Sequence, residues 1–597
     1  MSIKEILQNL IQNFSSENLI DLFRNKSNSF RQINEEENQY NNDFFSNGVK
    51  FGEIKLDSED ELIIYTFKTN KALTERSGKK AQYDLAKKIL KQEQRYAAGF
   101  FIFYDDNGSF RLSLVYDTPQ PNGKREWSNF KRFTYYVNPT KPNKTFRLQI
   151  DRANFESLNN IKKAFSIEAV TDDFYKEFKP NFESLSESIT GTKNLQLKQD
   201  FALLFIIRTI FLGFVQKKLW LNGDEEFIQN YWREYKEKYN NKNLFYDEWL
   251  RPLFFESLNY PPGRKVFNRS TPFSEKTALA LQMAPFLNGE LFKEKIGIDD
   301  QNLSVPDKMI EHFFEFLFSY NFTIEENTLY DQELELNPEF LGIIFERLVN
   351  KEDGAVYTPR TEVDFMCRIS LVKWLQKTSN VHKKKLYHLF FDKHSENKKD
   401  ELLEIDEKKE ILTLLKNITV CDPAAGSGAF PVGMLQVLDE TIQLLSEANN
   451  EPVRRPSLTD SVDGSAFERK KEIISRSLYG VEVKAWAVWI NQLRLWLSLF
   501  IDMPDQLNKS FEPLLPNLEF KIRRGDSLVQ KIGDKLFTVE SHANLSPQLK
   551  SKITLLKKDK ADFFYGRNRL NAKIIRKKEN DIFKEIIEEQ ILEKKRT

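Results

Sequence analysis

Cysteine is almost absent from this chain of 597 residues, which contains only Cys367 and Cys421. Two thiols exclude a disulfide framework and a zinc site made of cysteines, and they fit a reducing cytoplasm. The five histidines show no metal-ligand spacing, so we expect no metal centre built on them. A Walker loop with Lys followed by Ser or Thr is also missing, which excludes a nucleotide-driven motor of that kind.

An excess of charge of one sign is missing as well, because 89 Lys and Arg residues balance 88 Asp and Glu residues. A DNA-binding surface must therefore be a local patch. The N-terminal residues lack the apolar core of a secretory signal. The most apolar run, from Phe201 to Val215, is interrupted by Arg208 and falls short of the roughly 20 residues that a membrane span needs. It predicts a buried helix, and we expect a soluble cytoplasmic protein without a membrane partner.

Apolar residues make up 40% of the chain, which is enough for several cores, and its length predicts two to four domains. The first 150 residues predict an α+β domain. Residues 47–57 and 61–70 have strand patterns, residues 78–94 predict a helix, and Asn107-Gly108 between two β-rich runs predicts a hairpin.

Three further regions follow that domain. Residues 151–335 carry apolar residues at three- and four-residue spacing and predict an α-helical connector. Across residues 336–540, short apolar strands alternate with long helices, which is typical of a doubly wound, Rossmann-like α/β domain with a parallel sheet. Residues 541–597 are rich in Lys and Glu and predict a charged helical insert or tail.

A cofactor motif lies between the first of these strands and its helix. The strand runs into Asp422-Pro423, and a turn of small residues follows from Ala424 to Gly428. Glycines such as Gly426 let the backbone approach a ligand closely, and a helix N-terminus just beyond offers free N–H groups. A tight structural turn would explain a lone Gly-x-Gly, but the full motif directly after a strand favours a nucleotide-type site.

Two more carboxylates end the next strands. Glu482 ends the second strand, and a carboxylate at this position can accept hydrogen bonds from both hydroxyls of a ribose. Asp526 follows the third strand. Either residue alone could be a helix cap, but three carboxylates at the ends of three consecutive strands favour a ligand site.

Four segments resemble, in the same order, motifs of the gamma class of DNA adenine-N6 methyltransferases: AVYTPRTEVDFM, VCDPAAGSGAF, LYGVEV and RRGDSL. The chain is more closely similar to the methyltransferase part of type IIG restriction-modification enzymes. Upstream segments share the likeness, including ELNPEFLGIIFERLV, SIEAVTDDFYKEF and LTERSGKKAQYDLAKKIL, so it covers most of the chain. The resemblance implies a site-specific DNA adenine-N6 methyltransferase of a restriction-modification or phage-defence system, with S-adenosylmethionine as cofactor and double-stranded DNA as substrate.

The resemblance also implies which residues hold the cofactor. Asp422 would face the amino group of its methionine portion, which the Pro423, Ala424, Gly426 and Gly428 loop would cradle. The methionine end would also be covered by Tyr357, Thr358 and Pro359, with Thr358 reaching its carboxylate. Glu482 would accept the ribose hydroxyls and Asp526 the adenine amine. Val483 and Lys484 depart from the acid and proline that commonly follow the ribose acid.

The catalytic tetrapeptide of the family, Asn, Asp or Ser followed by two prolines and an aromatic residue, does not occur. The single Pro-Pro pair, Pro261-Pro262, lies in the connector and predicts a loop. The residues for methyl transfer are therefore unassigned. We expect a C-terminal portion or a second chain to supply this motif and the target-recognition domain.

Type IIG enzymes carry a PD-(D/E)xK nuclease at the N-terminus, which needs an acidic pair to hold Mg²⁺ and a lysine to activate water. Here Thr66-Phe67-Lys68 stands where Glu-x-Lys is expected, and Glu53-Ile54-Lys55 has the right spacing one strand earlier. Glu53 and Lys68 are thus nuclease candidates, with an exposed strand face as the alternative. Two other functions stay open: a nuclease subunit with a cofactor-sensing methyltransferase-like domain, and a non-catalytic fragment that binds DNA or a partner.

Overall fold

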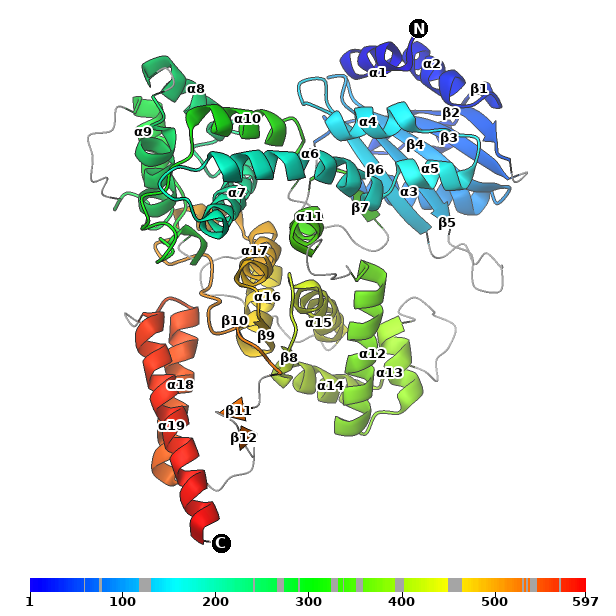
Figure 1. The fold of residues 1–597 in the computed structure, drawn as a ribbon. Coiled ribbons are helices and arrows are strands. Elements are labelled where there is room, and N and C mark those ends of the chain that lie inside the picture. Colours follow the sequence, from blue (N-terminus) through cyan, green and yellow to red (C-terminus); the bar gives the residue numbers. More distant parts are fainter. Residues whose placement is uncertain are drawn as a thin grey trace. The chain divides into compact units, whose positions relative to one another are not determined.

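The computed structural model forms two compact units (Figure 1). Unit 1 comprises Met1–Leu185 and Lys308–Leu348, and unit 2 comprises Ser186–Asp307 and Val349–Thr597. The expected connector is therefore divided between them. The structure describes residues 1–57, 60–74, 78–117, 130–239, 242–265, 273–287, 290–323, 331–336, 338–350, 358–391, 402–448, 464–528, 531–532, 535–536, 545–567 and 571–596.

Unit 1 is built on a seven-stranded mixed sheet whose strands follow one another in chain order. The strands are β1 (Phe30–Glu36), β2 (Phe45–Lys55), β3 (Glu61–Thr69), β4 (Tyr96–Tyr104), β5 (Phe110–Asp117), β6 (Phe130–Val137) and β7 (Asp331–Glu333). Only β3–β4 and β6–β7 are parallel. The helix α3 (Lys79–Gln92) makes the crossover that a parallel pair requires. The strands and the helix predicted within the first 150 residues are present, but the sheet also includes β7, which lies in the segment predicted as a helical connector.

The predicted hairpin joins β4 to β5, but its loop has five residues, because Tyr104 pairs with Phe110. The carboxylate of Asp105 accepts hydrogen bonds from the N–H groups of Asn107 at 3.0 Å and Ser109 at 2.9 Å. Gly108 has a φ of +79°, which a residue without a Cβ adopts easily. The aspartate thus stabilises a longer turn than a two-residue Asn-Gly turn.

Both faces of the unit 1 sheet are buried under aromatic side chains. On one face, Ile63, Tyr65 and Phe67 pack with Phe101 on the apolar side of α3. On the other face, Phe100 packs against Phe23, Phe155 and Phe165. The further helices are α1 (Ile3–Gln12), α2 (Ser16–Lys26), η1 (Asn38–Tyr40), α4 (Lys144–Arg152), α5 (Leu158–Ala164), α6 (Ile167–Ser188), α10 (Asp307–Leu317) and α11 (Pro338–Asn350).

The first part of unit 2 is helical and surrounds α7 (Leu195–Lys217). This helix is long and apolar enough to cross a membrane, and 89% of its most apolar stretch is buried inside the protein, as in a core helix. The predicted buried helix is therefore confirmed. Its neighbours are α8 (Phe227–Tyr239), η2 (Phe245–Leu250), η3 (Pro252–Ser257), α9 (Glu275–Met283) and η4 (Glu290–Phe292).

The second part of unit 2 contains a parallel sheet with the order β10-β9-β8. Its strands are β8 (Val420–Asp422), β9 (Leu478–Glu482) and β10 (Ile522–Arg524), and they coincide with the three predicted strands. Helices make the connections: α15 (Ala429–Ala448) and α16 (Gly464–Arg476) join β8 to β9, and α17 (Ala485–Ile501) joins β9 to β10. The described strands are added in one direction only, so the reversal of order that defines a doubly wound sheet is not seen within them.

The remaining elements of unit 2 flank this sheet in the chain. They are α12 (Arg360–Thr378), α13 (Lys383–Phe391), α14 (Ile405–Asn417), η6 (Asp505–Lys509), β11 (Lys531–Ile532) and β12 (Lys535–Leu536). The charged C-terminal segment is helical, as predicted. Its helices α18 (Pro547–Phe564) and α19 (Ala572–Arg596) pack on each other, and Phe563 and Ile575 cover Phe520.

A buried ion pair fixes α7 within unit 2. Arg208 donates to both carboxylate oxygens of Asp299, at 2.8 and 2.6 Å, and also donates to the carbonyl of Leu291 at 2.9 Å. Both charged side chains are almost completely buried. Removing one partner would leave the other charge uncompensated in the core.

We therefore expect Asp299→Asn to lower the free energy of unfolding of unit 2 by about 3–5 kcal/mol. Glu294→Gln is the matched control, because Glu294 pairs with Arg251 at the surface and such a pair contributes about 1 kcal/mol or less. Urea unfolding followed by tryptophan fluorescence measures the difference, since every tryptophan except Trp127 belongs to unit 2. Equal losses in the two variants would contradict the prediction.

Candidate functional site

Three carboxylates lie at one edge of the parallel sheet. The strand β8 ends at Asp422, β9 ends at Glu482, and Asp526 follows β10 by two residues. Asp422 pairs with Gly480, and Arg524 pairs with Glu482, in parallel ladders. Because the carboxyl ends of parallel strands meet at the same edge, the structure brings the three residues together where α/β sheets bind ligands.

The loop after β8 is shaped by glycines. Gly426 and Gly428 have φ values of +51° and +93°, in the left-handed region that favours glycine. The N–H of Gly426 donates to Glu482 Oε2 at 2.9 Å, which ties the loop to the neighbouring strand. A Cβ built at Gly426 meets no atom within 4 Å, so the space beside it is open. A Cβ at Gly428 would lie 2.6 Å from Asn491 Oδ1, so this side of the loop is filled.

Asp422 is the one carboxylate at this edge with a buried oxygen that has no partner. Its Oδ1 accepts from the N–H of Ala424 at 3.1 Å, whereas Oδ2 is buried and has no hydrogen-bond donor among the described residues. Burial raises the pKa of the Asp422 carboxyl, and the nearby Glu482 charge raises it further. The arrangement therefore favours a cationic hydrogen-bond donor, such as an ammonium group, beside Asp422.

Glu482 is held by two main-chain donors and retains acceptor capacity. Its Oε2 accepts from Gly426, and its Oε1 accepts from the N–H of Lys484 at 2.9 Å. A carboxylate offers about four lone-pair sites, so two remain for hydroxyl donors. The unusual residues Val483 and Lys484 leave this geometry intact, because Lys484 contacts the Glu482 carboxylate through its main-chain N–H.

The turn after β10 is attached to the turn after β8. Ser527 Oγ donates to the carbonyl of Pro423 at 2.6 Å. Asp526 is exposed, and its Oδ1 accepts from the N–H of Leu528 at 2.9 Å. Its second oxygen faces no protein donor among the described contacts, so it can accept an exocyclic amine. The three carboxylates thus belong to one connected rim.

The predicted segment that covers the methionine end is described only in part. Tyr357 lies outside the described residues, and Thr358 and Pro359 stand immediately before α12, with Pro359 at its N-cap position. Among the described residues no contact joins Thr358 to the carboxylates. The helix α12 approaches the site at Cys367, whose Sγ lies 4.0 Å from the carbonyl oxygen of Phe430. Burial raises the pKa of this thiol, and the negative charges of Asp364 and, to a smaller extent, Asp422 raise it further.

Sequence reasoning assigned no role to three residues at or behind this edge of the sheet. Val483 directly follows Glu482 and is 52% exposed, although it is apolar. Leu528 lies two residues after Asp526 and is 89% exposed. Exposed apolar side chains there can cover a flat ring. Asn491, behind Gly428, is fully buried. A polar pair, Asn491-Gln492, within the apolar run of α17 is the sequence signal that could have identified it.

The two nuclease candidates, Glu53 and Lys68, lie far apart on the sheet of unit 1. In the β2–β3 ladder, Glu53 is opposite Ile63, whereas Lys68 is opposite Ser46. Five residues along β3 separate the two positions by about 17 Å, at roughly 3.4 Å per residue. Side chains alternate along a strand, and Ile63 and Phe67 face α3, so Lys68 points to the opposite face. The structure therefore does not bring Glu53 and Lys68 together, and a role of either residue in DNA cleavage stays a prediction.

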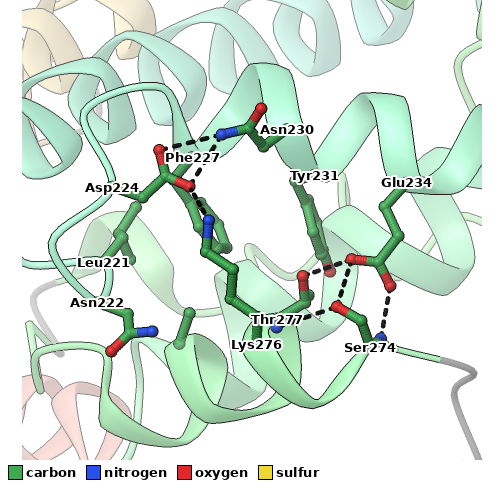
Figure 2. A pocket seen from close by; sticks show the side chains of 11 residues that line it. Leu221, Asn222, Asp224, Phe227, Asn230, Tyr231, Glu234, Ser274, Lys276 and Thr277 are labelled. Atoms are coloured by element: carbon green, nitrogen blue, oxygen red, sulfur yellow. Dashed lines mark hydrogen bonds and ion pairs between the residues drawn. The ribbon is translucent and has the colours of Figure 1, made fainter.

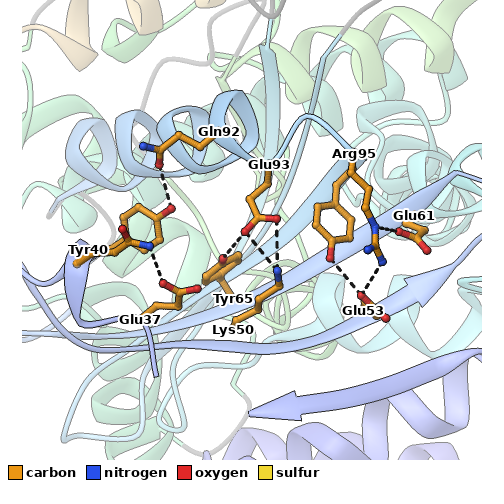
Figure 3. Close-up of polar contacts among 11 residues, drawn as sticks. Glu37, Tyr40, Lys50, Glu53, Glu61, Tyr65, Gln92, Glu93 and Arg95 are labelled. Atoms are coloured by element: carbon orange, nitrogen blue, oxygen red, sulfur yellow. Dashed lines mark hydrogen bonds and ion pairs between the residues drawn. The ribbon is translucent and has the colours of Figure 1, made fainter. Parts of the chain in front are cut away.

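Each nuclease candidate has a local partner instead. Glu53 accepts hydrogen bonds from Arg95 at 3.2 Å and from the hydroxyl of Tyr96 at 3.1 Å. Figure 3 shows Arg95 beside Glu53. Lys68 forms an ion pair with Asp106 at 2.7 Å. In the part of the chain that the structure describes, no group of three His, Cys, Asp or Glu side chains could hold a metal ion. Thus Glu53 stabilises the end of the sheet beside α3.

A separate small pocket lies between α8 and α9 (Figure 2). Its volume is about 80 Å³. Asp224 accepts from Asn230 at 2.9 Å and Lys276 at 3.0 Å, and Glu234 accepts from Ser274 and Thr277, both at 2.5 Å. Protein donors already hold both carboxylates, so this cluster joins the two helices.

A known protein is similar in sequence to more than half of this chain. The chain is 30% identical over 414 residues to a Methanocaldococcus jannaschii protein named as a candidate type II restriction enzyme and methyltransferase. The alignment covers 62% of this chain and 33% of the relative, so the chain spans about a third of that protein. No protein-family model matches. The chain is thus similar to a protein of the restriction-modification class.

Two solved structures also show a distant likeness. A type IIL restriction-modification enzyme, MmeI, in complex with DNA has a TM-score of 0.36 and 16% identity, covering 61% of this chain and 41% of that one. A DrdV–DNA complex has a TM-score of 0.27 and 11% identity, covering 88% and 40%. Scores this low do not establish a common arrangement of domains.

The partly buried Asp422 carboxyl yields a stability prediction. Folding raises the pKa of this carboxyl, so the folded state is favoured while the carboxyl is protonated. This contribution to stability is complete below the unfolded pKa, roughly 4, and it is lost as the pH rises through the higher pKa of the folded state. Asp422→Asn removes the charge, so we expect the ligand-free variant to be at least as stable as the wild type at pH 8, with an advantage that shrinks towards pH 5. Urea unfolding at both pH values measures this.

The exposed Asp505, in the same unit, provides the control, since Asp505→Asn should change stability by less than about 0.5 kcal/mol at either pH. A large loss of stability in Asp422→Asn at pH 8 would mean that Asp422 is held by a donor within the protein.

Proposed function

We propose that this chain is the S-adenosylmethionine-binding part of a DNA adenine-N6 methyltransferase in a restriction-modification system. The observation that carries the proposal is the buried, unpaired oxygen of Asp422 beside the glycine loop, at the sheet edge it shares with Glu482 and Asp526. The similarity to a protein of the restriction-modification class supports the same function.

The cofactor and the rim are complementary in charge and shape. S-adenosylmethionine carries an ammonium and a sulfonium, and two carboxylates whose charges interact favour such a cation. Glu482 would accept the ribose hydroxyls, and Asp526 the adenine amine. The open space beside Gly426 lets the backbone approach the methionine portion, near the N-terminus of α15. Thr358 and Pro359, with Tyr357, would cover its end.

When bound, S-adenosylmethionine supplies an electrophilic methyl group. The residues of this chain bind and orient it, and they hold its charged groups away from bulk water. Double-stranded DNA is the substrate that this function implies, and the adenine would have to leave the stack to reach the methyl group. The tetrapeptide that would contact the adenine is proposed to come from further polypeptide, either a C-terminal portion or a second chain.

The alternative of a nuclease subunit is less well supported. A Mg²⁺-dependent nuclease needs acidic groups and a lysine around one ion, whereas Glu53 and Lys68 lie far apart and on opposite faces. A cofactor-sensing role without methyl transfer would still use the same rim. Restriction activity in the complete system is therefore assigned to no residue of unit 1.

The test is calorimetric titration of the purified chain with S-adenosylmethionine. We expect Asp422→Asn to weaken binding by about tenfold or more, because a charge-assisted hydrogen bond contributes about 1.5–3 kcal/mol. Binding to the wild type should strengthen as the pH rises through the folded pKa of Asp422, which lies above its usual value, and binding to Asp422→Asn should not.

Asp505→Asn should bind as the wild type does, because Asp505 lies on the exposed η6. If Asp422→Asn retains wild-type affinity, the cofactor assignment is wrong. Methyl incorporation into DNA, tested with the proposed missing polypeptide added, then separates an enzyme from a non-catalytic binder.

A further inference from the structure

The helix α17 carries buried polar side chains that hold the cofactor rim from behind. Gln492 and Arg494 are 4% and 8% exposed. Gln492 Nε2 donates to the carbonyl of Ile522 in β10 at 3.3 Å, and Arg494 Nη1 donates to the carbonyl of Ser427 in the glycine loop at 3.3 Å. Side chains of one helix thus bind main-chain carbonyls of both the strand that leads to Asp526 and the loop that follows Asp422.

Asn491 directly precedes Gln492 in α17, but its side chain makes no hydrogen bond with the described residues. It is completely buried, and neither its amide oxygen nor its amide nitrogen has a hydrogen-bond partner among the described residues. Buried amides are nearly always paired, because an unpaired one destabilises the fold. The surrounding helix is rich in leucine and tryptophan, and a leucine of similar size at this position would avoid the cost.

The unpaired amide touches the glycine loop. A Cβ at Gly428 would lie 2.6 Å from Asn491 Oδ1, so the amide occupies the place that a side chain at residue 428 would take. Gly428 has a φ of +93°, and a residue without a Cβ can rotate here with little strain. The Gly428 N–H already donates to Ala425, and the carbonyls of Gly428 and Ser427 accept from Val432 and Arg494. A carbonyl oxygen has two lone pairs, so either carbonyl can accept a second hydrogen bond from the Asn491 amide nitrogen.

We infer that Asn491 is a positioning residue, whose amide pairs with the main chain of the Ser427–Gly428 turn when the cofactor occupies the open side of the loop. This inference rests on the proposed function. Asn491 is unpaired in the free protein and paired in the complex, so it favours the bound arrangement of the loop. A ligand shifts such an equilibrium only by its difference in affinity for the two states, and the amide adds to that difference. The glycine loop thus lies between two groups that lack a hydrogen-bond partner in the free protein, the Asp422 oxygen and the Asn491 amide.

The test compares Asn491→Leu with Gln492→Leu in the full chain. Asn491→Leu removes an unpaired buried amide, so we expect a higher unfolding midpoint without ligand, together with a five- to fifty-fold weaker Kd for S-adenosylmethionine. Gln492→Leu removes a side chain that is already bonded to Ile522, so its ligand-free midpoint should fall. Urea unfolding and calorimetric titration measure the two quantities.

A direct readout is the ¹⁵N-labelled side-chain amide of Asn491, whose resonance is assigned by its loss in Asn491→Leu. Addition of S-adenosylmethionine should shift it and slow its hydrogen exchange. An unshifted amide, a Kd within twofold of the wild type, or a joint loss of stability and affinity in Asn491→Leu would overturn the inference. A wild type that does not bind S-adenosylmethionine overturns the proposed function itself, whereas binding that is indifferent to Asn491 overturns this inference alone.

Discussion

The hydrogen bond from the Gly426 N–H to the Glu482 carboxylate connects the parts of the rim on which ligand recognition depends. It joins the loop after β8 to the end of β9, and Lys484 donates to the same carboxylate. Ser527 adds the turn after β10 through Pro423. These hydrogen bonds fix the three loops relative to one another before a ligand binds. Binding therefore costs little conformational entropy in the loops.

The unpaired polar groups at this rim lower the stability of the ligand-free protein. Oδ2 of Asp422 is buried near another carboxylate, and the Asn491 amide is buried without a partner among the described residues. A buried polar group without a hydrogen bond destabilises the folded state. Strained or unpaired groups of this kind are typical of functional sites, where a ligand supplies the missing interaction. The ion pair of Arg208 and Asp299 has the opposite character, because every group there is already satisfied by the protein.

Local patterns in the sequence were sufficient for the strands, the buried helix α7 and the three carboxylates at strand ends, since each depends on a few neighbouring residues. They did not identify contacts between residues that lie far apart in the chain. Glu53 has an acid-x-lysine spacing, but its environment is set by Arg95 and Tyr96, about forty positions away. The five-residue hairpin loop depends on how the Asp105 side chain folds back on the turn. Asn491 required knowledge of what packs behind Gly428.

Unit 1 is discontinuous in the chain, and this has a consequence for biosynthesis. Its last strand, β7, pairs in parallel with β6 and comes from residues almost two hundred positions later. During translation the edge of β6 therefore stays unpaired while the whole of Ser186–Asp307 is made. Long-range strand pairing is slow, and an open edge can pair with other chains. The sheet of the first domain therefore cannot be completed until Asp331–Glu333 has been synthesised.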